Sequence, residues 1–190
     1  MRLIIFCILY FFGCFLFAQE KREVEKRVNK GDVPAMARGF IEEAYDTKRK
    51  IRWYYQTEGE EISYEAKLYW KDQLHSVEFD TLGDIIDIEI VVNWEMIDSP
   101  VRQNLEAYFN TNYDKWDLDK IQVQWSGPME NLKELIKKDQ QSGLTKRFEI
   151  EYRGATETED ELWEGLFSGD GKELLQKRKI VLGNLNNLTY

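Results

Sequence analysis

Three stretches of the chain place apolar residues three and four positions apart, and each lies close to a proline. They cover residues 34–46, 100–109 and 129–136. This spacing gathers apolar side chains on one face of a helix. A proline is well tolerated in the first helical turn, because the N–H that it lacks would have no partner there. The pattern therefore predicts three helices.

Between the helices, apolar and polar residues alternate, which is typical of strands with one buried face. Short turns containing Gly, Asp or Glu separate several of these stretches, which favours an antiparallel meander packed against the helices. The chain is therefore predicted to be an α+β protein. The alternating stretches are 51–55, 62–70, 75–79 and 86–92, then 121–125 and 148–152, and less regularly 162–167 and 174–181.

The order of a helix followed by strands occurs twice, which predicts two helix-plus-antiparallel-sheet units in tandem, each with its own core. The first unit covers residues 33–92. The second covers 93–182 and has an insertion near 128–145. Residues 19–32 are charged and are interpreted as a loose leader or a short solvated helix. The tail 183–190 is rich in Asn and Leu, and its pattern predicts no element.

The first 18 residues have a different character. Arg2 precedes an uncharged apolar run at 3–17, and Ala18 ends that run. This order is typical of a cleaved signal peptide, and the run is shorter than the roughly 20 residues of a spanning helix. We predict cleavage after Ala18, a periplasmic or secreted protein, and no membrane span after cleavage. An uncleaved N-terminal anchor and a lipoprotein signal at Cys14 are the alternatives.

Composition narrows the classes of function. Both cysteines, Cys7 and Cys14, lie in the predicted signal peptide, so the mature chain has no disulfide and no thiolate site. The chain has 26 basic and 35 acidic residues and a formal net charge of −9. This balance argues against nucleic acid or an anionic membrane as a partner.

Short motifs recur at matching places in the two predicted units. Residues 51–53 read Ile-Arg-Trp and 123–125 read Val-Gln-Trp. Residues 79–83 read Phe-Asp-Thr-Leu-Gly and 167–171 read Phe-Ser-Gly-Asp-Gly. In the last pair an aromatic residue is followed, after three residues, by a glycine that can supply the positive φ of a tight turn.

This order resembles the PepSY-like family, also called the β-lactamase-inhibitor-protein-like (BLIP-like) family. The family pattern is a Pro-initiated helix, an aromatic-bearing strand, a Tyr-Glu strand, then Phe-Asp-x-x-Gly and a final strand. The first unit matches it throughout, with Tyr64-Glu65 as the dipeptide. The second departs at Ser168, where the family has Asp. The resemblance implies an exported protein whose sheet binds another protein, and it implies no catalytic residues.

Residues capable of catalysis or metal binding are sparse. The single histidine, His75, occupies an inward strand position and is predicted to be a core residue. Metal sites normally combine several ligands, and no catalytic motif or nucleotide-binding loop is present. We therefore predict no metal, no cofactor and no catalytic residue. Asp80, Asp84 and Asp87 lie near Gly83 without the spacing of a calcium loop, and are predicted to form turns.

Carboxylates next to one another keep an enzymatic alternative open. They occur at Glu42-Glu43, Glu60-Glu61 and Glu159-Asp160-Glu161. An exported hydrolase would need two carboxylates roughly 5 to 9.5 Å apart in a cleft. A passive structural protein of the envelope is a third possibility.

The polar face of the first predicted sheet is the candidate binding surface. It mixes aromatic and charged side chains of types that favour protein interfaces. The partner would be another envelope or secreted protein, and the alternative is an ordinary solvated sheet face. The candidate residues are Arg52, Tyr54, Lys67, Tyr69 and Glu78.

Overall fold

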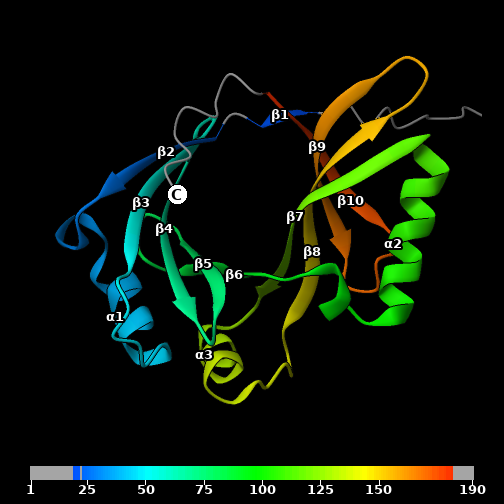
Figure 1. Ribbon diagram of the computed structural model, residues 1–190. Helices are drawn as coiled ribbons and strands as arrows, with labels where there is room; N and C mark the ends of the chain where they lie inside the picture. The colour runs from blue at the N-terminus through cyan, green and yellow to red at the C-terminus, as the bar shows by residue number, and fades with distance from the viewer. Residues whose placement is uncertain (1–18, 22, 182–190) are drawn as a thin grey trace, which may run out of the picture.

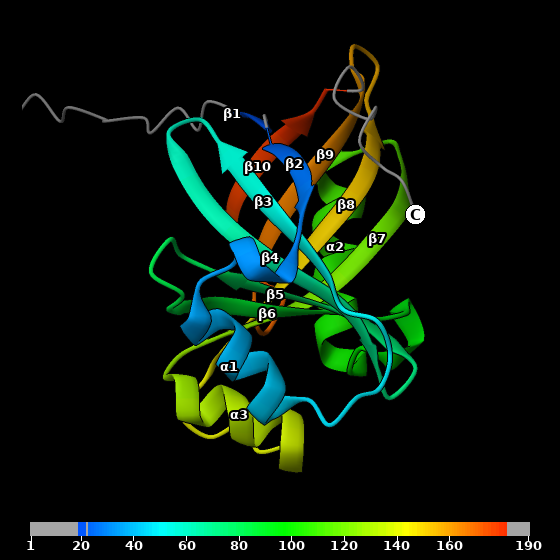
Figure 2. The same ribbon diagram turned by 90° about the vertical axis from the view of Figure 1, so that its left-hand side faces the viewer.

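The computed structural model describes residues 19–21 and 23–181, so the predicted signal peptide and the tail 183–190 lie outside the described residues. These residues form one curved ten-stranded sheet with three α-helices on its outer side (Figures 1 and 2). The α+β class predicted from the sequence is confirmed. The strand order is β1-β10-β9-β8-β7-β6-β5-β4-β3-β2. Each strand from β2 to β10 pairs antiparallel with its neighbours in that series, and β1 pairs with β10 in parallel.

The predicted helices and strands all form, with most ends shifted by a few residues. The helices are α1 (Ala35–Ala44), α2 (Ser99–Asn112) and α3 (Met129–Lys138), and short 3-10 turns cover Lys30–Asp32 and Trp94–Met96. No helix within residues 19–21 and 23–181 is long and apolar enough to cross a membrane. The strands are β1 (Gln19–Lys21), β2 (Glu23–Val28), β3 (Arg52–Glu58), β4 (Glu61–Trp70), β5 (Gln73–Phe79), β6 (Ile85–Val91), β7 (Lys115–Ser126), β8 (Thr145–Ala155), β9 (Asp160–Ser168) and β10 (Leu174–Ile180).

Strand alternation divides the sheet into an apolar outer face and a polar inner face. The apolar side chains of the outer face pack under the helices, where Phe40 of α1 meets Phe79 of β5 edge to face at 5.8 Å. Leu105 of α2 and Leu132 of α3 are also fully buried. The buried apolar residues form one continuous cluster. The prediction of two separate cores is therefore wrong, because β6 pairs with β7 and joins both halves in one sheet.

The segment 19–32 is not the loose leader or helix that its charge suggested. Glu23–Val28 pairs along its length with β3, and Gln19–Lys21 pairs with β10 at the other end of the strand order. Charged residues suit this position, because β2 is an edge strand whose inner face is polar. The N-terminal segment thus bridges the two ends of the curved sheet (Figure 1).

The turn between β5 and β6 packs directly on the start of α1. Gly83 has a φ of +93°, and a Cβ there would lie 2.9 Å from Pro34 Cβ and 3.0 Å from the Ala37 backbone nitrogen. Asp80 Oδ1 accepts hydrogen bonds from the backbone N–H groups of Leu82 and Asp84. This confirms Asp80 as a turn-forming residue, whereas the prediction that Asp87 forms a turn is wrong, because Asp87 lies within strand β6.

We therefore expect Gly83→Ala to lower the free energy of unfolding by roughly 3 kcal/mol, because it combines left-handed strain with a backbone clash. Gly59→Ala is the matched control: its φ is +60° and its Cβ would meet nothing within 4 Å. It should cost about 1 kcal/mol. Urea unfolding measures both. Equal losses would show that the turn does not depend on its contact with α1.

Candidate functional site

The inner face of the sheet lines a half-open cavity of about 520 Å³. It is polar because alternation sends the apolar side chains of the same strands to the helices. Its lining contains ten carboxylates and three basic groups. The carboxylates are Glu23, Glu25, Glu58, Glu61, Glu65, Glu78, Asp87, Glu89, Glu149 and Glu151, and the basic groups are Lys67, Lys120 and Arg178.

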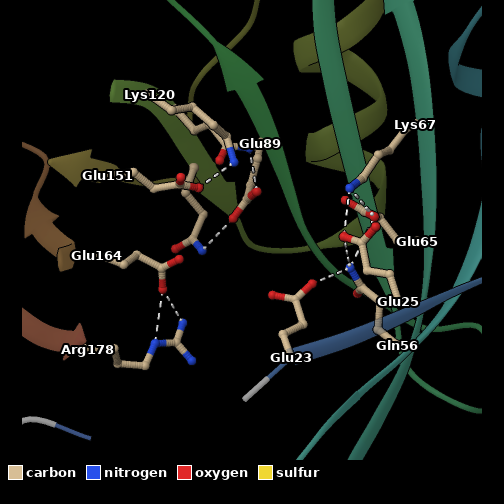
Figure 3. A network of polar contacts seen from close by, with 12 residues as sticks. Glu23, Glu25, Gln56, Glu65, Lys67, Glu89, Lys120, Glu151, Glu164 and Arg178 are labelled. Carbon is tan, nitrogen blue, oxygen red and sulfur yellow. Dashed lines mark hydrogen bonds and ion pairs between the residues drawn. The ribbon is translucent and has the colours of Figure 1, made fainter. Parts of the chain in front are cut away.

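Gln56 of β3 organises one wall of the cavity (Figure 3). Its Nε2 lies 2.9 Å from Glu23 Oε1, 3.3 Å from Glu25 Oε1 and 3.0 Å from Glu65 Oε2. Its Oε1 accepts a hydrogen bond of 3.0 Å from Ser63 Oγ. One buried amide therefore holds together carboxylates from β2 and β4, so the N-terminal strand is part of the site.

Lys67 Nζ lies between two of these carboxylates, 2.7 Å from Glu25 and 3.1 Å from Glu65 (Figure 3). Burial tends to raise the pKa of Glu25, but the Lys67 charge and hydrogen bonds outweigh it and the pKa is lowered. Burial dominates at Glu65 and raises its pKa to about 7, with repulsion from Glu25 adding to the rise and Lys67 opposing it. Near neutral pH Glu25 is therefore ionised, whereas Glu65 is close to half protonated.

The opposite wall comes from the second half of the chain. Lys120 of β7 donates to Glu151 of β8 at 2.9 Å, and Gln122 Nε2 donates to Glu89 of β6 at 2.7 Å. In each pair, both side chains line the cavity and are held by the hydrogen bond between them (Figure 3). The wall is thus held in place before any ligand arrives.

Arg178 of β10 connects the two ends of the sheet across the cavity. Its Nη2 lies 2.8 Å from Glu164 Oε1 on the neighbouring strand β9, and its Nη1 lies 2.5 Å from Glu58 Oε1 on β3. Glu164 is 2% exposed. The guanidinium neutralises a buried carboxylate and closes the curved sheet next to the bridge that β1 and β2 make.

An acidic row crosses β4, β5 and β6 on the cavity floor. Glu65 is directly opposite Glu78, and Glu78 is directly opposite Asp87. Asp87 is 7% exposed, and its Oδ1 has no hydrogen-bond partner within the described part of the chain. Burial and repulsion from Glu78, Glu149 and Glu65 raise its pKa, and Arg147 offsets part of this effect.

Two of the five predicted face residues line the cavity, and three do not. Lys67 and Glu78 line it. Tyr54 lies beside the lining, with Lys67 Nζ 5.1 Å from its ring centroid, and Arg52 is opposite Lys67 in the strand register. Tyr69 is 47% exposed and lies on a separate surface near the loop 46–49. The centre of this polar face is a half-open hollow rather than the open sheet face that the sequence suggested.

The sequence reasoning missed the residues contributed by the N-terminal segment and by the second half of the chain. Glu23 and Glu25 are two positions apart, as strand residues on one face would be, but their charge favoured a leader. Glu149 and Glu151 alternate with apolar neighbours in the same way. The i, i+2 spacing of these carboxylates was the available signal.

The other candidate residues have structural roles. His75 is a core residue, as predicted: it is 3% exposed, its Nδ1 is 3.2 Å from Tyr45 Oη, and burial lowers its pKa to about 4. Among the paired carboxylates, Glu43 binds Lys133 and Asp160 binds Arg153. Within the described ranges, no group of three or more His, Cys, Asp or Glu residues is arranged to hold a metal ion.

Together, the fold and the cavity define an α+β protein whose helices cover one face of a curved sheet and whose other face is a polar hollow. A DUF2874 family protein from Bacteroides ovatus has a similar solved structure, with a TM-score of 0.52 and 14% identity over 77% of this chain and 87% of that one. The solved structure of a BLIP-like protein from Bacteroides fragilis has a TM-score of 0.48 and 15% sequence identity, over 77% of this chain and 86% of that one. No family model and no curated protein matches the sequence. The likeness to the Bacteroides ovatus structure is one of fold, and it supports the α+β arrangement expected from the sequence resemblance.

The raised pKa of Glu65 makes stability depend on pH in a defined direction. The native carboxyl, with a pKa of about 7, holds its proton at pH values where the unfolded carboxyl, with a pKa near 4.3, has lost it. Stability due to Glu65 is therefore complete below about pH 4 and declines as pH rises to about 7. The decline amounts to roughly 3 kcal/mol.

Glu65→Gln should abolish this component, because glutamine does not titrate. Urea unfolding of wild type and Glu65→Gln between pH 4 and pH 8 measures the difference. Glu157→Gln is the control, since Glu157 is an exposed loop carboxylate, and its curve should run parallel to that of wild type. A parallel curve for Glu65→Gln as well would contradict the raised pKa.

Proposed function

We propose that this is an exported, non-catalytic binding protein that holds a peptide or a segment of another protein on the inner face of its sheet. The observation that carries the proposal is the half-open 520 Å³ cavity, in which Gln56, Lys67, Lys120 and Gln122 already hold carboxylates by hydrogen bonds. A preorganised polar pocket loses little conformational entropy when a ligand binds. The family resemblance, which implies a protein-binding sheet of inhibitor type, supports the same reading.

Export is the second part of the proposal. It is supported by the sequence of residues 1–18, which has the order of a cleaved signal peptide. N-terminal sequencing of the exported protein tests it, and the expected first residue is Gln19. A chain that still begins at Met1 and remains with the membrane fraction would contradict cleavage.

The tandem origin of the two halves is the third part. Gly83 and Gly171 both have positive φ and both form tight turns. A Cβ on Gly83 would meet the start of α1, and a Cβ on Gly171 would lie 3.0 Å from the Val101 carbonyl oxygen near the start of α2. The same turn-on-helix contact at matching places supports duplication of one unit, whose copies now share a sheet and a core.

A site-specific photocrosslinker distinguishes the cavity from the rest of the surface. Benzoylphenylalanine in place of Glu61, an exposed residue on the cavity lining, should capture the partner in envelope extracts. The same replacement at Glu106, an exposed carboxylate on α2 at the outer side of the sheet, is the matched control. The partner should be captured at Glu61 and not at Glu106.

Capture at Glu106 alone would show that the partner binds the helical side of the protein, which would contradict the proposal. The same protein captured at both positions would contradict a specific role of the cavity. No capture at either position would favour a passive structural protein of the envelope.

One observation favours a second candidate, an exported hydrolase. Glu25 and Glu65 bind the same ammonium nitrogen, and the pKa of one is lowered while that of the other is raised, as in an acid–base pair. However, Lys67 Nζ occupies the space between them that a scissile bond would need. Binding is therefore the better-supported function. If the protein hydrolyses chromogenic glycosides and Glu65→Gln loses this activity, hydrolysis becomes the better-supported function.

A further inference from the structure

The cavity lining has a surplus of negative charge that its own basic groups do not balance. Lys67 contacts Glu25 and Glu65, Lys120 contacts Glu151, and Arg178 bridges Glu58 and Glu164. All three cations of the lining are thus occupied by carboxylates, while the lining contains ten acidic residues. A cavity with low-dielectric walls concentrates the resulting negative potential and attracts cations.

The acidic row on the floor makes folding less favourable. Like charges directly opposite one another on neighbouring strands are destabilising, and the row has two such pairs, Glu65–Glu78 and Glu78–Asp87. A local arrangement that opposes folding indicates a functional site. A bound cation would relieve the repulsion.

Asp87 adds an independent indication of a ligand. Its side chain is more than nine-tenths buried on the cavity lining, and its Oδ1 lacks a hydrogen-bond donor. Buried polar atoms are almost always hydrogen-bonded, so an unpartnered carboxylate oxygen at a cavity wall marks the place where a ligand can donate.

The size and the remaining lining of the cavity define the class of cation. A volume of 520 Å³ is far larger than a bare metal ion requires, and falls in the range of small-molecule sites. Apolar side chains also line it: Ile62, Ile86, Ile180 and Val181. Apolar surface beside clustered carboxylates suits alkyl chains that end in ammonium groups, which bury their methylenes and direct their charge to acceptors.

We infer that the cavity binds a ligand that presents two or more ammonium groups on alkyl chains, and that Asp87 is a specificity-determining residue for it. Two sources share this chemistry: a free polyamine and the lysine side chains of a peptide. The inference rests on the proposed function, because it names the ligand of the same cavity.

Calorimetric titration of the exported protein at about 0.15 M salt tests the inference, because charges on open surfaces are largely screened there. The probes are spermidine and an N-acetylated trilysine amide. Acetylated triglutamate amide is the negative control. Binding of either cationic probe with a Kd below about 1 mM is expected. If only spermidine binds, the source is a polyamine, and if only the peptide binds, the source is a lysine-rich segment.

Asp87→Asn removes the charge and keeps the shape. It should weaken binding of the cationic probe at least tenfold, while the melting temperature stays the same or rises because the acidic row is relieved. A purely structural role for Asp87 would lower the melting temperature instead. Glu157→Gln, an exposed loop carboxylate, should leave binding unchanged. If Asp87→Asn does not fold, Glu78→Gln replaces it as the test variant, because it removes a negative charge from the same acidic row.

The inference is overturned if neither cationic probe binds at millimolar concentration, if triglutamate binds equally well, or if the folded Asp87→Asn binds like wild type. Its failure is distinguishable from failure of the proposed function. A partner captured at Glu61 but not at Glu106, together with no binding of cations, would leave a binding cavity of different specificity. No capture and no cation binding would refute both.

Discussion

Replacing Phe79 by alanine is expected to lower the free energy of unfolding by about 3 to 5 kcal/mol. Phe79 is 0% exposed and lies on the outer face of the sheet, against α1. Its ring centroid is 5.8 Å from that of Phe40 on α1 and 6.2 Å from that of Trp53 on β3. Truncation removes both ring contacts and leaves a cavity between helix and sheet that neighbouring side chains fill only in part. Urea unfolding measures the loss.

Tyr69→Ala is the matched control, because it also removes a ring from the first four strands of the meander. Tyr69 is 47% exposed and belongs to the face directed away from the helices. We expect a loss below about 1 kcal/mol. A large loss of stability in Tyr69→Ala with a small loss in Phe79→Ala would mean that the buried and exposed faces of the sheet are assigned the wrong way round. The cavity could then not be a binding site.

Replacing Arg178 by methionine is expected to cost about 3 to 5 kcal/mol. Methionine keeps a long apolar chain but removes the charge that neutralises Glu164, which is 2% exposed. A buried carboxylate without its partner is costly to desolvate. The same change removes the contact with Glu58 that holds β10 against β3. Urea unfolding gives the magnitude, and faster hydrogen exchange of the β2 and β10 backbone amides would show that the sheet has opened.

Two variants separate this effect from a general effect of removing arginine. Arg153 also forms a close ion pair, at 2.6 Å to Asp160, but both side chains are more than half exposed. Arg153→Met should therefore cost less than about 1 kcal/mol. In the double variant Arg178→Met with Glu164→Gln, the buried charge is absent, so much of the stability should return. If the double variant is no more stable than Arg178→Met, burial of the Glu164 charge is not the cause.

The sequence determined the elements of this protein and the faces of most of them. Phe79 and His75 occupy alternate positions of one strand and are both buried on the helix side, while Glu78 between them lines the cavity. Strand periodicity alone places these side chains, because successive residues of a strand point to opposite faces. Gly83 was likewise correctly identified as a positive-φ turn residue.

The same reasoning failed where charge and periodicity pointed in different directions. Glu23 and Glu25 belong to a strand, yet a run of charged residues after a predicted signal peptide favoured a solvated leader. Burial of a charged strand is acceptable only where partners such as Gln56 and Lys67 satisfy it. Those partners lie more than 30 residues further along the chain, so local pattern contained no sign of them.

Only the tertiary structure decided that the polar face closes into a cavity. Asp87, Glu151 and Arg178 are each an ordinary polar strand residue in the sequence, and nothing local shows that they line one hollow. Their convergence depends on the curvature of the sheet and on the N-terminal segment, which pairs with β10 at one end and with β3 at the other. The direction of a side chain depends on its position within a strand, so the local sequence pattern predicts it. The closure of a sheet depends on pairing between residues far apart in the chain, so the local pattern cannot predict it.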